Sequence, residues 1–231
     1  MMREKTIFTE DMMSLEKLPA YAFAGQKQIA DVSEIIFNIQ QDKRRDKAVS
    51  MMKLMAQKLV VSGLSAFRRE YSSISHARMI DRAAQADREA QKISEGLREL
   101  YMGLCKENMM LDTLKKLLED STDELEAAYD ALEKHIDEMQ LSSANIQYRD
   151  FAQKRLKDLE LSKTLAMQGM LLITELTVNN STLAERINSL TVNTLVLWRA
   201  DLAAMKSSPD KTKLERICGI EDVITAAIAS I

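Results

Sequence analysis

Residues 97–139 read LRELYMGLCKENMMLDTLKKLLEDSTDELEAAYDALEKHIDEM. Apolar side chains recur here at strict seven-residue intervals: Leu97, Leu104, Leu111, Leu118, Leu125, Leu132 and Met139. A repeat of this period predicts a long helix that packs along one seam. The positions three residues further on are mixed: Leu100, Glu107, Leu114, Ser121, Ala128 and His135. Because this companion series is uneven, we predict one arm of a coiled-coil-like hairpin within the chain rather than an independent two-stranded zipper.

A second apolar series follows a turn that we predict near residues 140–146. It advances mostly in steps of three, four or seven residues: Leu161, Leu165, Leu172, Leu176, Leu183, Ile187, Leu190, Leu197 and Leu202. This spacing predicts the return arm of an antiparallel hairpin. Asn179, Asn180 and Thr194 interrupt its apolar face, and Pro209 ends it, because proline cannot continue a helix.

The composition favours an all-α fold. The chain of 231 residues contains only 6 Gly and 2 Pro, and its β-branched residues do not alternate with polar ones, which disfavours strands and numerous loops. We predict a flexible lead-in over 1–25, an N-terminal helical segment over 26–75 packed against the hairpin, the hairpin itself over 76–206, and short helices with an apolar tail over 207–231.

The charge balance excludes some classes of partner. A formal net charge of -3 gives no general attraction to nucleic acid or anionic lipid, and we predict no nucleic-acid partner. The most apolar stretch, 161–178, contains Lys163 and Glu175 and falls short of a membrane span. No secretory signal is evident, and Cys105 and Cys218 are widely separated, so we expect a reducing cytoplasm.

The sequence lacks the patterns that carry catalysis. His76 and His135 are the only histidines, and neither has a Cys or His partner at metal-ligand spacing. There is no GxSxG motif and no glycine-rich phosphate loop. We therefore predict no enzyme activity, no metal and no cofactor, and we interpret His135 as a packed seam residue.

Two charged stretches remain open to interpretation. Residues 119–138 hold nine acidic residues against Lys134, which fits a solvated helix face better than a docking surface for a basic partner. A basic stretch precedes the hairpin: Arg68, Arg69, Arg78, Arg82 and Arg88. Since Asp81, Asp87 and Glu89 are interspersed, we favour ion pairing along a helix, and contact with an anion stays open.

The return arm carries a family resemblance. The run RLKDLELSK over 155–163, with the polar and aromatic residues that follow it, resembles the TelA/KlaA toxic-anion-resistance family. The stretch 21–34 is similar to that family's N-terminal signature, and 111–136 to its central coiled segment. The motif residues, whose roles the resemblance leaves unassigned, are Arg155, Asp158, Lys163, Gln168, Asn179, Asn180, Thr194 and Trp198. The chain departs from the family where it has Leu171 and Val196 in place of prolines, so we expect a straighter helix, and its tail is shorter.

The resemblance implies a role in bacterial resistance to tellurite and related toxic anions, or in envelope stress, without a known reaction. Our leading hypothesis is a non-enzymatic coiled-coil interaction protein with stress-resistance proteins as partners, and self-association is compatible with the heptads. One alternative is a scaffold peripheral to the inner face of the membrane, suggested by the apolar tail over 223–231. The other is a protein that binds the oxyanion directly or acts through a thiol, with Arg155, Lys163 or Cys105 as the contact residues.

Overall fold

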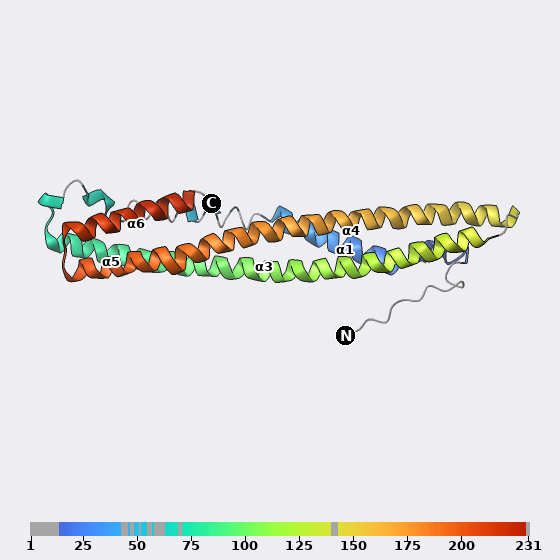
Figure 1. Ribbon diagram of the computed structural model, residues 1–231, viewed down its shortest axis with the longest axis horizontal. Coiled ribbons are helices and arrows are strands. Elements are labelled where there is room, and N and C mark those ends of the chain that lie inside the picture. Colours follow the sequence, from blue (N-terminus) through green and yellow to red (C-terminus); the bar gives the residue numbers. More distant parts are fainter. Residues whose placement is uncertain are drawn as a thin grey trace. The chain divides into compact units, whose positions relative to one another are not determined.

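The computed structural model describes residues 14–42, 63–68, 71–139 and 143–229, together with residues 46, 49, 50, 52–54 and 57. The elements are η2 (Leu18–Ala20), α1 (Phe23–Gln41), η3 (Ser65–Phe67), η4 (Tyr71–Ser73), α3 (His76–Glu138), α4 (Ser143–Ser189), the π-helical η5 (Leu190–Thr194), α5 (Leu195–Ser207) and α6 (Lys211–Ala229) (Figure 1). No strand occurs in the described parts of the chain, and the all-α prediction is confirmed.

The chain divides into two compact units, and each is built from two separate stretches. Unit 1 comprises 1–41 with 109–178, and unit 2 comprises 42–108 with 179–231. Helices α3 and α4 therefore contribute to both units. The turn predicted near 140–146 falls partly on 140–142, outside the described residues, and α4 begins at Ser143.

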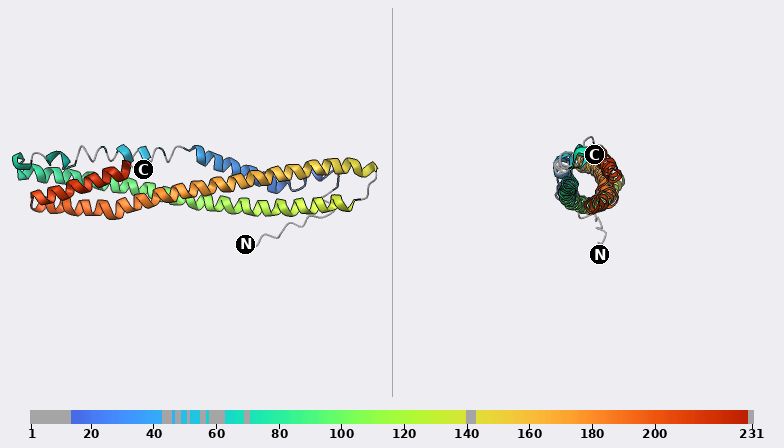
Figure 2. Two further views of the ribbon diagram at one scale, coloured as in Figure 1. Left: turned by 45° about the horizontal axis from the view of Figure 1, so that its top comes forward. Right: turned by 90° about the vertical axis from the view of Figure 1, so that its left-hand side faces the viewer.

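Unit 1 holds the central part of the heptad repeat. Its seam leucines are fully buried: Leu111, Leu118, Leu125 and Leu132. In this unit α3 and α4 lie side by side with opposite directions, because Tyr148 packs edge-on against His135 while Lys163 pairs with Glu126 (Figure 2). The interpretation of His135 as a packed residue agrees with this contact.

Two glycines let the helices of unit 1 approach closely. A Cβ atom on Gly25 of α1 would lie 3.1 Å from Leu125 Cδ2. A Cβ atom on Gly169 of α4 would lie 3.0 Å from Leu118 Cδ1 and 3.5 Å from Ile36 Cδ1. A Cβ contact shorter than about 3.4 Å requires the neighbouring side chain to move, so the packing at both positions favours glycine.

Unit 2 packs the first heptad leucines against the end of the hairpin and α6. Asp87 of α3 accepts hydrogen bonds from Arg199 (2.9 Å) and Lys206 (2.8 Å) of α5. Helix α6 is continuous over 19 residues, so the prediction of a short helix followed by a tail is wrong. The reason is that Asp210 caps its N-terminus through Lys213 N (2.8 Å), while apolar residues three or four places apart continue to its end.

The buried face of the return arm differs in part from the predicted one. Its buried seam in α4 is itself a heptad of mostly small or β-branched residues: Ala152, Leu159, Ala166, Ile173, Asn180 and Ile187. Leu161 and Leu165, which we expected in the seam, are exposed. Leu176, Ile187, Leu190 and Leu202 of the predicted series are buried, so the spacing of leucines selects the correct side only in part.

The π-helical segment changes the register once more. Buried positions step from Ile187 to Leu190, then by five residues to Leu195 and on to Trp198. A π-turn accommodates one extra residue, so Leu197, seven residues after Leu190, lies exposed. The chain is α-helical through Leu171, as we expected where proline is absent. Just before Val196 it forms a π-turn, which we did not predict.

Candidate functional site

Arg155 ties the N-terminal segment of unit 1 to α4. Its side chain is only 11% exposed, and its Nε atom donates to the Tyr21 carbonyl oxygen at 3.0 Å, with Nη2 directed at the same oxygen. Ala22, the next residue, has a φ of 55°, a left-handed conformation that L residues seldom adopt. Burial lowers the pKa of Arg155, while Asp158, whose carboxylate lies 3.9 Å away, favours the charged form. This arginine therefore stabilises a strained turn.

Tyr21 secures the same turn from the other side. Its hydroxyl donates to the Ala128 carbonyl oxygen of α3 at 2.9 Å, and burial raises the pKa of Tyr21 to about 12. Gln26 of α1 donates to the Asp158 carbonyl oxygen and to Ser162 Oγ at 3.1 and 2.8 Å. The start of the family-like run is thus an anchor for α1.

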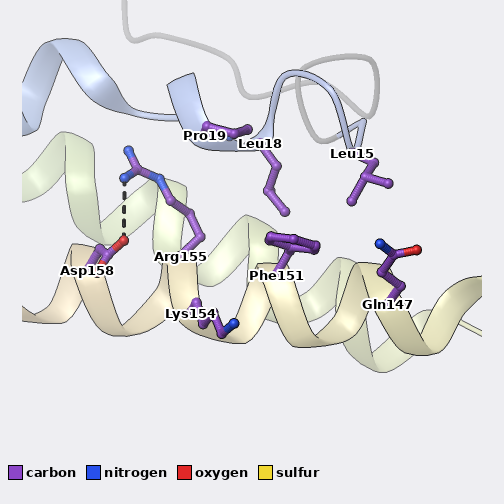
Figure 3. Close-up of a pocket in the computed structure, with 8 residues that line it drawn as sticks. All are labelled: Leu15, Leu18, Pro19, Gln147, Phe151, Lys154, Arg155 and Asp158. Atoms are coloured by element: carbon purple, nitrogen blue, oxygen red, sulfur yellow. Dashed lines mark ion pairs between the residues drawn. The ribbon is translucent and has the colours of Figure 1, made fainter.

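A groove of about 540 Å³ opens beside Arg155 (Figure 3). It is lined by Leu15, Leu18, Pro19, Gln147, Phe151, Lys154, Arg155 and Asp158. The ammonium of Lys154 lies 5.5 Å from the ring centre of Phe151, within cation–π range. The guanidinium at this groove already binds a backbone carbonyl.

Lys163, the other residue predicted to contact an anion, also has a protein partner. Its Nζ atom lies 2.9 Å from Glu126 Oε1 of α3 and 5.7 Å from the ring centre of Tyr129. Lys163 does not line the groove that contains Arg155. The structure therefore gives each of the two cations its own protein contacts and does not bring them into that groove together.

Asn180 forms a polar layer in the seam of unit 2. It is fully buried, and its Nδ2 atom donates to Glu107 Oε1 and Asn108 Oδ1, both at 3.0 Å. Asn108 in turn donates to Ser181 Oγ at 3.1 Å. A buried amide at a heptad position fixes the register of paired helices, because a shift would leave it without partners. The neighbouring Asn179 is exposed.

Trp198 borders a buried polar cluster in unit 2 that sequence reasoning missed and that is centred on Glu221. It is fully buried and faces the carboxyl of Glu221, which accepts hydrogen bonds from Leu64 N (2.9 Å) and Ser65 N (3.0 Å) and from Ser65 Oγ. The indole favours the charged carboxylate, although its Nε1 atom makes no hydrogen bond of standard geometry among the described residues. Burial outweighs these donors and raises the pKa of Glu221.

A sequence signal for this cluster did exist. Glu221 shares the apolar face of α6 with Leu214, Ile217, Ile224 and Ile228, so an acid interrupts an otherwise apolar series. Cys218 is also buried there, and burial, together with Glu221, raises the pKa of its thiol. Cys218 therefore stays protonated, which disfavours it as a nucleophile. Thr194, the last π-helical residue, is partly buried.

The exposed side of α4 in unit 1 is unusually apolar. Five large side chains on it are more than two fifths exposed: Leu161, Leu165, Met167, Leu171 and Val178. We call these five residues the α4 outer face. At 3.6 residues per turn Leu161, Leu171 and Val178 lie opposite the buried seam, Leu165 and Met167 lie on the two flanks, and the motif residue Gln168 is exposed among them.

Among the residues that the structure describes, no group of three or more His, Cys, Asp or Glu side chains could hold a metal ion. None of the helices in the described ranges has the length and apolar character needed to cross a membrane.

Comparison with known proteins identifies one relationship. A family model described as toxic anion resistance protein (TelA) matches residues 24–208. The match includes α1, the whole of α3 and α4, and α5. No curated protein and no solved structure matches the chain.

Proposed function

We propose that this chain, which belongs to the toxic anion resistance protein (TelA) family, serves toxic anion resistance as a non-enzymatic interaction protein. The α4 outer face is the surface that binds the partner. The partner is another protein that contributes an amphipathic helix, because such a helix can lay its apolar side along an exposed apolar stripe.

The scarcity of charge on this side carries the proposal, because its exposed acid Glu175 comes only after the stretch from Leu161 to Thr174. Between Leu161 and Thr174 the only charged residue is Lys163, and its side chain pairs with Glu126 of α3. The outer side of α4 is therefore uncharged over 14 residues, about 21 Å at the helical rise. Solvent-facing helix surfaces are normally rich in charge, and a contiguous apolar patch is typical of a binding site.

The same observation favours a protein over a membrane surface. Helices that lie in the membrane interface carry Lys and Arg beside their apolar face, which attract anionic lipid. In the stretch from Leu161 to Thr174 the one cation is Lys163, and its ammonium already pairs with Glu126. The experiment must distinguish a partner helix from two other occupants of the α4 outer face, a membrane surface and a second copy of the chain.

The contacts of the family-like polar residues support a non-enzymatic role. Arg155 binds a backbone carbonyl, Lys163 a carboxylate and Asn180 a buried polar layer. These residues hold the helices together. We propose that the family motif in the return arm preserves the helical frame that displays the α4 outer face.

The experiment replaces two apolar residues of this surface with glutamate. The double variant Leu161→Glu, Leu171→Glu is compared with the native chain and with Met109→Glu, which makes the same kind of change at an exposed apolar residue on α3. Each chain is expressed in its host with a site-specific photo-crosslinking residue at position 168. We expect one crosslinked protein with the native chain and with Met109→Glu, and none with the double variant.

Two controls separate the other occupants. Light scattering of the native chain tests self-association, and flotation with vesicles of anionic lipid tests membrane binding. A crosslink between two copies of the chain, or flotation that the double variant abolishes, would refute a partner helix as the occupant.

A further inference from the structure

Unit 2 contains a second concave site, whose lining includes three arginines of the basic stretch. It has a volume of about 540 Å³ and lies between η3 and the first turns of α3. Its lining residues are Phe67, Arg78, Asp81, Arg82, Ala84, Gln85 and Arg88. We call it the arginine pocket.

One aromatic ring organises two of the arginines. The guanidinium carbon of Arg78 lies 5.8 Å from the ring centre of Phe67, and that of Arg82 lies 6.0 Å from it. Arg82 is held further by donating from Nε to the Gly63 carbonyl oxygen at 3.2 Å and from Nη1 to Gln85 Oε1 at 3.3 Å. Guanidinium groups held in this way lose less conformational entropy when they bind a ligand.

The pocket has an excess of positive charge. Its lining contains three arginines and a single acid, Asp81, whereas the whole chain has a formal net charge of -3. Arg78 and Arg88 form no ion pair with any residue that the structure describes, in contrast to Arg68, Arg199 and Arg216, which each pair with an aspartate. The helix-surface ion pairing that we expected for this stretch does not extend to Arg78 and Arg88.

We propose that the arginine pocket binds a small oxyanion with two or more negative charges, of the phosphate type. Guanidinium groups present paired N–H donors that match the oxygens of such an anion, and two unpaired arginines supply the charge to balance it. The ligand is either a free inorganic oxyanion or the same group on an organic molecule.

This site is independent of the α4 outer face. It uses residues of η3 and α3 in unit 2, whereas the proposed partner surface belongs to unit 1. It also differs from the anion contacts that we predicted at Arg155 and Lys163. Failure of one proposal therefore leaves the other intact.

Isothermal titration calorimetry of the full chain at low ionic strength tests the proposal. Inorganic phosphate and tellurite are the inorganic probes, phenyl phosphate is the organic one, and chloride is the monovalent control. The test variant is Arg78→Gln, Arg88→Gln. The matched control is Arg98→Gln, Arg149→Gln, which removes one exposed and one half-exposed arginine outside the pocket and so changes the net charge by the same amount.

We expect saturable binding of phosphate or tellurite by the native chain and by the control, and weakening by about tenfold or more in the test variant, since charge-assisted hydrogen bonds are lost. Binding of phenyl phosphate with equal affinity would extend the ligand class to attached phosphate groups. The proposal is overturned if no probe binds the native chain, or if the control weakens binding as much as the test variant. Circular dichroism checks that each variant keeps its helix content, and Arg78→Lys, Arg88→Lys should bind with intermediate affinity.

Discussion

The contact between Gly169 of α4 and Leu118 of α3 permits a quantitative test of the helix packing in unit 1. A Cβ atom on Gly169 would approach Leu118 Cδ1 to 3.0 Å, and Leu118 itself is fully buried. We therefore expect the two substitutions Leu118→Ala and Gly169→Ala to be coupled. Each should change the free energy of unfolding by a different amount in the presence of the other.

The expected magnitudes follow from burial and contact. Leu118→Ala removes a buried side chain and leaves a cavity, at a cost of about 3–5 kcal/mol. Gly169→Ala alone gains about 1 kcal/mol of helix propensity but crowds Leu118 at a cost of about 1–3 kcal/mol. In the Leu118→Ala background the crowding is absent and the new methyl group fills part of the cavity. There Gly169→Ala should stabilise by about 1–2 kcal/mol, which gives a coupling of about 1–4 kcal/mol.

Urea unfolding of the native chain, both single variants and the double variant, followed by circular dichroism, measures this coupling. Gly103→Ala is the control, because a Cβ atom there meets no other atom within 4 Å, and it should stabilise by about 1 kcal/mol in either background. If the effects of the two substitutions add to within about 0.5 kcal/mol, the close packing of α3 on α4 at this point is wrong.

Three further predictions concern burial and charge. Burial raises the pKa of Glu221, so this carboxyl binds a proton more readily in the folded chain than in the unfolded chain. The free energy of unfolding should therefore fall as pH rises above about 4.5. Glu221→Gln should flatten this pH dependence in unfolding curves measured between pH 4 and pH 8. Burial acts to raise the pKa of Asp87, but the hydrogen bonds from Lys206 and Arg199 outweigh it and lower this pKa. The Asp87 carboxylate should therefore stabilise the folded chain above about pH 4, and this contribution is lost as pH falls through the lowered pKa. Asp87→Asn should destabilise by about 1–2 kcal/mol at pH 7 and by less near pH 2, and an equal effect at both pH values would contradict the pairing. Leu161→Ala should change the free energy of unfolding by less than about 0.5 kcal/mol, because the side chain is 69% exposed. A loss above about 2 kcal/mol would show instead that Leu161 is buried in the seam.

The outgoing arm was predictable because its seam is made of leucine. Every Leu of the series from Leu97 to Leu132 is buried, and α3 begins at His76, where the hairpin was expected to start. Large aliphatic residues on one side and charged residues on the others leave a single interpretation.

The return arm was only partly predictable because its seam is made of small residues. Ala152, Ala166 and Gly169 face inward where helices come close together, while Leu161 and Leu171 face outward. Leucine spacing measures apolar character and not proximity to another helix, so it cannot distinguish a seam from a binding surface on the same helix.

The candidate sites could not be predicted from the sequence because they depend on contacts between residues far apart along the chain. The sequence does not indicate that Arg155 contacts Tyr21 or that Lys163 contacts Glu126, since these partners lie far away along the chain. The arginine pocket depends in the same way on Phe67, which reaches α3 from η3. These pairings follow from how the chain folds back on itself, which local periodicity does not encode.

We propose that this chain acts in toxic anion resistance through the α4 outer face. The most direct measurement is the tellurite tolerance of a host strain that lacks its own copy and carries the native chain, Leu161→Glu with Leu171→Glu, or Met109→Glu, at equal protein levels. We predict that the native chain and Met109→Glu restore tolerance and that the double variant does not. Full tolerance with the double variant, folded and present at the native level, would contradict the claim.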